Sequence, residues 1–110
     1  MLQDNNAKEN EKIVVHVDGE IEDLIPGFLE NRRKDGRNIL NALDNDDYET
    51  IRILGHSMKG AGGGYGFDAI TDIGKSLEEA AKEKKADEIR NRARELLEYL
   101  ERVEIVFEQS

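Results

Sequence analysis

The stretch GHSMKGAGGGYG, residues 55 to 66, holds six of the ten glycines in the chain around one histidine and one lysine. Glycine-rich tracts normally disfavour helix, yet apolar residues at helical spacing lead into this one and resume after it. On a helix over residues 47 to 64, with about 100° between successive residues, one side is apolar. That buried stripe comprises Ile51, Leu54, Met58 and Ala61. His56 falls on the opposite side, which predicts an exposed imidazole.

The glycines of this helix fall into two groups. Each glycine in a helix interior costs roughly 0.5–1 kcal/mol of stability relative to alanine. A helix with this many glycines therefore needs a physical explanation for them. Close packing against another helix explains Gly55 and Gly62, which lie toward the core. It does not explain Gly60 and Gly63, which face outward with His56. Their missing side chains leave clearance for a bulky partner that approaches the ring.

Lys59 lies one turn beyond His56 on the same face of the helix. Because like charges repel, its ammonium group disfavours a positive charge on the imidazole and keeps that ring nucleophilic. The same ammonium group stabilises a negative group that arrives at the ring. These features together suit a histidine that accepts a phosphoryl group. Arg52, one turn earlier, either adds positive charge or is simply solvated.

The rest of the chain predicts an all-α fold, an antiparallel four-helix bundle with a short N-terminal helix or an extended lead-in. The lead-in IVVHV, residues 13 to 17, suits a strand but has no recognisable sheet partner, and Asp18 can cap a short turn over residues 19 to 25. A helix starts near Pro26, with Gly36 as a possible bend, and Asp46 or Asp47 caps the next. The apolar stripes of the other three helices are Phe28, Leu29, Ile39, Leu40 and Leu43; Phe67, Ile70, Ile73, Gly74, Leu77, Ala80 and Ala81; and Ile89, Ala93, Leu96, Leu97, Leu100, Val103 and Phe107.

Composition limits the class of protein. The 110 residues predict one domain over residues 13 to 110, preceded by a flexible polar tail over residues 1 to 12. The 25 acidic and 16 basic side chains give a net charge of −9, which disfavours binding to nucleic acid or to a membrane surface. The chain has no cysteine, signal peptide or apolar run long enough to span a bilayer. We therefore expect a monomeric, cytoplasmic protein.

The residues around His56 resemble the signature of the histidine phosphotransfer (HPt) domains of two-component phosphorelays. That signature is H-x-x-K-G followed by small residues and a helix-ending glycine, here His56, Lys59, Gly60, residues 61 to 64 and Gly66. The stretches LIPGFLENRRKD before it and LEEAAKEKKAD after it are similar to the neighbouring helices of the family. The resemblance covers about residues 18 to 107, and the triple glycine 62 to 64 departs from the more usual alanine- and serine-rich version.

The resemblance implies that His56 accepts a phosphoryl group from a receiver-domain aspartate and passes it to another, with Lys59 neutralising the phosphoryl oxygens. The partners would be receiver domains of response regulators, a hybrid sensor histidine kinase, or both. The protein would be a carrier with no cofactor of its own, because the receiver brings the Mg²⁺. The residues that leave room for the receiver and contact it would be Gly60, Gly63, Gly64, Arg52 and Ile53. Ile53 also suits a position at the edge of the core. Leu24, Ile25 or Phe28 could complete an apolar docking patch.

Other classes of function fit the sequence less well. A nucleotide-binding loop needs its lysine after the glycines and between a strand and a helix. A metal-binding bundle needs Glu-x-x-His pairs, but the only other histidine is His16. A hydrolase needs a nucleophile near the histidine, and Ser57 points about 100° away from it. A helical adaptor that docks a partner without transferring phosphate remains the alternative, as does an HPt domain embedded in a dimeric kinase.

Overall fold

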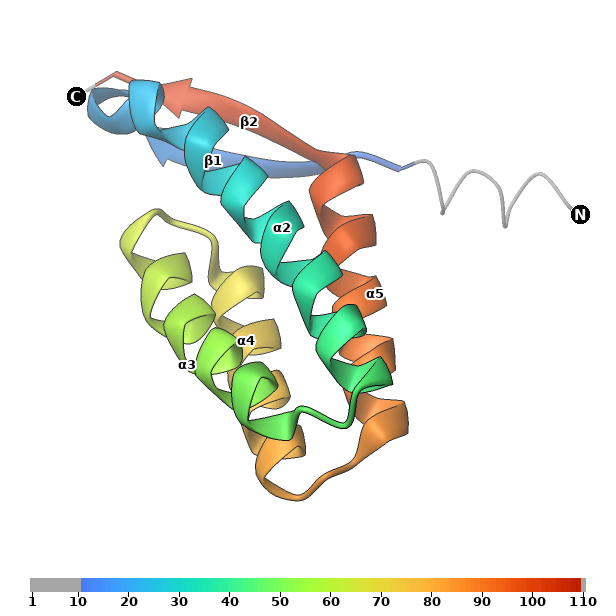
Figure 1. Ribbon diagram of the computed structural model, residues 1–110. Helices are drawn as coiled ribbons and strands as arrows, with labels where there is room; N and C mark the ends of the chain where they lie inside the picture. The colour runs from blue at the N-terminus through green and yellow to red at the C-terminus, as the bar shows by residue number, and fades with distance from the viewer. Residues whose placement is uncertain (1–10, 110) are drawn as a thin grey trace, which may run out of the picture.

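The computed structural model describes residues 11 to 109, so most of the predicted tail over residues 1 to 12 lies outside the described residues. Figure 1 shows the long helices side by side, with the short strands across one end of them. The elements in order are β1 (Ile13–Asp18), the 3-10 helix η1 (Gly19–Leu24), α2 (Ile25–Asp44), α3 (Tyr48–Gly64), α4 (Asp68–Lys82), α5 (Ala86–Arg102) and β2 (Val103–Glu108). The predicted four-helix bundle is confirmed, and the strands are a minor addition to it.

Local capping chemistry explains where the helical segments begin. The Asp18 side chain accepts a hydrogen bond of 2.9 Å from the Glu20 backbone N–H at the start of η1. Pro26 lies in the first turn of α2, where its missing N–H costs nothing. Of the two candidate caps for α3, Asp47 is the one used, since its side chain accepts from the Thr50 backbone N–H at 3.1 Å.

The core lies between the four helices and is built from the predicted stripes. Every residue of the stripe expected for α4 and the turn before it is buried, from Phe67 to Ala81. Gly36 does not break α2. Instead, a Cβ atom there would lie 2.7 Å from Leu97 Cδ2 on α5, so the glycine lets these two helices pack closely.

The segments before and after the four helices, β1 and β2, pair as a parallel sheet. This pairing corrects the expectations that residues 13 to 17 have no sheet partner and that the last helix reaches Phe107. β1 has a partner after all, because Ile13 pairs with Val103 and the register continues to Asp18 and Glu108. The last helix also ends at Arg102 and does not continue to Phe107. Val103 and Phe107 are four residues apart, which fits a helix, but with Ile105 they also fit a strand with alternate residues turned inward.

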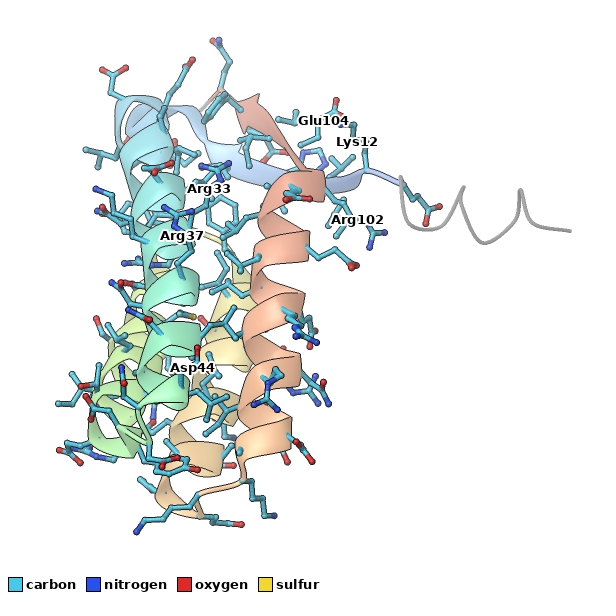
Figure 2. The ribbon with its side chains drawn as sticks, turned by 45° about the vertical axis from the view of Figure 1, so that its right-hand side comes forward. Lys12, Arg33, Arg37, Asp44, Arg102 and Glu104 are labelled. Carbon is cyan, nitrogen blue, oxygen red and sulfur yellow. The ribbon has the colours of Figure 1, made fainter. Side chains whose placement is uncertain are left out.

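The entry of the chain into this sheet is held by α5. Figure 2 shows Arg102 at the junction of α5 and β2, next to the segment that leads into β1. Its Nε donates a hydrogen bond of 2.8 Å to the backbone carbonyl of Glu11, and its Nη1 contacts Glu98 at 3.1 Å. The sheet therefore ties the N-terminal lead-in to the end of the last helix, away from the middle of α3.

Candidate functional site

The structure places His56 in the middle of α3 with its side chain 66% exposed. The fully buried side of the helix is formed by Ile51, Gly55, Met58 and Gly62. Leu54 and Ala61, expected in the buried stripe, are partly buried at its margin. The imidazole therefore stands on the outer face, as the helical wheel predicts.

Glycines bring α3 and α4 into backbone contact beside this histidine. A Cβ atom on Gly74 of α4 would lie 2.6 Å from the Lys59 backbone nitrogen and 2.8 Å from the Gly55 carbonyl oxygen. A Cβ atom on Gly55 would in turn lie 2.7 Å from the Glu78 backbone nitrogen. Gly62 makes an equally close contact with Thr71, so the expected packing role of Gly55 and Gly62 is confirmed. This close approach brings the side chains of α4 within reach of His56.

The close approach of the two helices places Glu78 of α4 next to His56. Glu78 is the one buried charged residue of the described part of the chain. Its Oε2 lies 3.1 Å from His56 Nδ1, and its Oε1 lies 2.9 Å from Lys59 Nζ. The hydrogen bond from Lys59 is the main cause that holds the pKa of the Glu78 carboxyl below its ordinary value, and the bond with His56 adds to it, while burial acts in the opposite direction. Glu78 is therefore ionised at neutral pH.

An ionised carboxylate only accepts hydrogen bonds, so the proton of this contact must be on Nδ1 of His56. In the neutral ring the other nitrogen, Nε2, then carries the free electron pair. Because Nδ1 points at the buried carboxylate and the ring is mostly exposed, Nε2 is the nitrogen available to a partner. The site thus presents one oriented nucleophile at the surface.

Sequence reasoning missed Glu78, although the sequence carried a signal for it. On a helix, Glu78 follows Gly74 by one turn and belongs to the same side as the apolar stripe of α4. A carboxylate on an apolar stripe needs a partner. The simple pair of His56 and Lys59 expected from the sequence is therefore a three-residue cluster, with a carboxylate between the two basic groups.

The glycines outside the core leave the surface next to His56 bare. A Cβ atom on Gly60 or Gly64 would have no heavy atom within 4 Å, and one on Gly63 would make only an ordinary contact with Thr71 Oγ1 at 3.5 Å. All three glycines are exposed. Their surface is the clearance that the sequence suggested.

Arg52 is not part of the cluster. Its guanidinium group makes two hydrogen bonds to the Glu49 carboxylate, with distances of 3.1 and 2.6 Å. These bonds raise the pKa of Arg52 above its already high ordinary value. Its positive charge is therefore matched by Glu49.

The candidates for an apolar docking patch separate into exposed and buried residues. Ile53 is 52% exposed and Leu24 is 54% exposed, so the alternative that Ile53 packs at the edge of the core is wrong. Ile25 and Phe28 are buried, and the Phe28 ring stacks on Tyr65 with centroids 4.3 Å apart. Only Leu24 and Ile53 of this set present apolar surface to a partner.

Comparison with known families bears on this site. A family model described as the Hpt domain matches residues 23 to 105, which is most of the chain and includes α2 through α5. The chain belongs to the Hpt domain family. It therefore has a phosphorelay role in two-component signalling, as a phosphotransfer carrier that interacts with receiver domains and not as a catalyst.

Searches of curated proteins and of solved structures gave no significant match. Between residues 11 and 109, no helix combines the length and apolar character needed to cross a bilayer. Over the same residues, no group of three or more histidine, cysteine or carboxylate side chains is arranged to hold a metal ion. His16, the second histidine, lies on the sheet, where its Nδ1 is 3.0 Å from Glu108 Oε2.

Proposed function

We propose that His56 is the phosphoacceptor of this Hpt domain, taking a phosphoryl group from an aspartyl phosphate of one receiver and passing it to an aspartate of another. The observation that carries the proposal is the exposed imidazole whose Nδ1 is held by the buried Glu78 carboxylate. That contact orients the ring and leaves Nε2 as the nucleophile. Within residues 11 to 109, His56 is the histidine that also has a lysine on its carboxylate partner and open glycine surface beside it.

The transfer balances without any redox or metal group in this chain. The Nε2 electron pair forms the bond to phosphorus, the bond between phosphorus and the aspartyl oxygen breaks, and its electrons stay on the receiver carboxylate. The ring keeps its proton on Nδ1 and gains positive charge, which the Glu78 carboxylate at 3.1 Å stabilises. Transfer to the next receiver is the reverse of this step. The receiver supplies the Mg²⁺ and the acidic pocket.

The direct test is to mix the protein with a receiver carrying labelled phosphate and to follow the label. A phosphoryl group on histidine is acid-labile and base-stable, whereas one on aspartate is labile in base. Base-stable label on this chain supports the proposal. Stable association with the receiver but no label would contradict it and would favour a helical adaptor that docks partners without transfer.

Lys59→Ala is expected to slow transfer by about 10-fold while the bundle stays folded, since one charge-assisted contact to a phosphoryl group is worth of the order of 1–2 kcal/mol. The Lys59 side chain is 37% exposed and Lys59 is not among the buried residues of the core. Stopped-flow or rapid-quench transfer rates measure the first effect, and helical circular dichroism measures the second. Transfer at the parental rate would remove Lys59 from the site.

Gly60→Leu is expected to block docking of the receiver with little effect on the isolated protein. A side chain at Gly60 enters open space in the free domain, because nothing lies within 4 Å of its Cβ position. Gly60→Ala serves as the matched control, since it gains about 0.5–1 kcal/mol of helix stability and adds only one methyl group. Receiver titrations by calorimetry should show weaker binding for leucine than for alanine. Equal affinities would mean that the receiver does not approach Gly60.

A further inference from the structure

A second lysine reaches the same buried carboxylate. Lys82 lies one helical turn after Glu78 on α4, and its Nζ is 3.9 Å from Glu78 Oε2. That oxygen is the one that contacts His56 Nδ1 at 3.1 Å. Glu78 thus joins three basic side chains, namely His56 and Lys59 from α3 and Lys82 from its own helix.

The charges of this cluster do not cancel. One carboxylate faces two ammonium groups, so the cluster carries a surplus positive charge while the imidazole is neutral. Without Lys82 the cluster would be neutral. Arg52 does not change this count, because Glu49 matches its charge. A local surplus of positive charge in a chain with a net charge of −9 is a feature that calls for an anionic partner.

Lys82 also has room to move. Its side chain is 57% exposed and lines an open groove of about 410 Å³ between the start of α3 and the end of α4, together with Tyr48 and Lys84. Its contact with Glu78, at 3.9 Å, is longer than the 2.9 Å contact made by Lys59. Only the lysine end of this long ion pair is exposed, and water competes there for the ammonium group, so the pair holds Lys82 weakly. Lys82 can therefore leave Glu78 for a stronger anion at little cost.

We propose that Lys82 is a second phosphoryl-binding cation, kept beside His56 by Glu78 and transferred to the phosphoryl oxygens when the ring is phosphorylated. This inference rests on the proposed function of His56. A phosphoryl group carries close to two negative charges at neutral pH, and Lys59 alone neutralises only one of them. Lys82 supplies the second positive charge, while Glu78 remains with the Nδ1 proton of the ring.

The consequence is a shift in the position of equilibrium between the two phosphorylated proteins. A cation that binds phosphohistidine stabilises it relative to the aspartyl phosphate of the receiver. Lys82→Gln should therefore move phosphate about 2- to 5-fold toward the receiver, the effect expected for one partly exposed ion pair. Lys82→Arg should restore most of the parental distribution, because the charge is kept.

The test uses the whole chain with two phosphate sources. Phosphoramidate phosphorylates the histidine without a protein partner, and a receiver charged by acetyl phosphate then measures the partition of phosphate between the two proteins. Lys84→Gln is the matched control, because Lys84 lines the same groove and loses the same charge but has no contact with Glu78 within the described residues. The difference between the two variants should shrink in about 0.5 M salt, where exposed charges are screened.

Thermal unfolding separates phosphoryl binding from a structural role. Phosphorylation should raise the unfolding temperature of Lys82→Gln less than that of Lys84→Gln. A structural role would instead lower the unfolding temperature of unphosphorylated Lys82→Gln and leave the partition unchanged, which would overturn the inference. If phosphate were partitioned equally in the parental, Lys82→Gln and Lys84→Gln proteins, the inference about Lys82 would also be overturned. The proposed function of His56 would be unaffected by that result. Failure of the parental protein to acquire phosphohistidine at His56 would overturn both.

Discussion

His56→Gln is expected to reduce phosphoryl labelling of the protein to background, a loss of at least about 100-fold, because a glutamine amide offers no nucleophilic nitrogen. The variant should fold normally, since the imidazole is 66% exposed and contributes nothing to the hydrophobic core. Glutamine can also keep a hydrogen bond to the Glu78 carboxylate. Acid-labile, base-stable label after incubation with a phosphorylated receiver is the measurement.

His16→Gln provides the matched control for this experiment. His16 is the other histidine of the chain, is similarly exposed at 58%, and pairs with a carboxylate, Glu108, at a comparable distance. It lies on the sheet, and no lysine between residues 11 and 109 shares its carboxylate partner. We expect parental labelling in His16→Gln. Label that survives in His56→Gln and disappears in His16→Gln would move the acceptor to the sheet.

Gly74→Val is expected to destabilise the protein by about 3 kcal/mol or more, at the upper end of what overpacking costs. The atoms that a new side chain would meet are the Lys59 backbone nitrogen and the Gly55 carbonyl oxygen, at 2.6 and 2.8 Å from its Cβ. Backbone atoms of a helix do not yield as a side-chain end does, so α3 and α4 must separate. Urea unfolding followed by circular dichroism measures the loss, which is a large part of the stability of a domain of this size.

The same substitution should disrupt the site, because separating the helices moves Glu78 away from His56 and Lys59. Gly27→Val is the control, as a Cβ atom on Gly27 of α2 would have no atom within 4 Å. Its unfolding midpoint should stay near that of the parental protein. A Gly74→Val protein with the parental midpoint would show that the backbones of α3 and α4 do not touch as described.

Much of this protein follows from local pattern in its sequence. Apolar residues at helical spacing are enough to predict four helices, their buried sides and the outward direction of His56 on α3. Asp18, Pro26 and Asp47 likewise mark the starts of their segments through local chemistry. These features depend on residues a few positions apart, and a helix of fixed pitch converts such spacing directly into a face.

The sheet depended on tertiary structure. β1 and β2 are separated in the sequence by all four helices of the bundle. Whether a short apolar segment forms a strand depends on the strand that it pairs with. The run from Val103 to Phe107 satisfies both helical and strand periodicity, so its sequence alone leaves the choice open. Pairing with Ile13 to Asp18 decides it.

The sequence alone determined that a histidine lies beside a lysine on the exposed face of a glycine-bearing helix. The carboxylate that joins them was decided only by the tertiary structure. A helical wheel defines which way a side chain points but says nothing about which residue of a neighbouring helix lies opposite. That register is set by the contact of Gly55 with Gly74, which places Glu78 beneath His56 and Lys59 and brings Lys82 to the same oxygen.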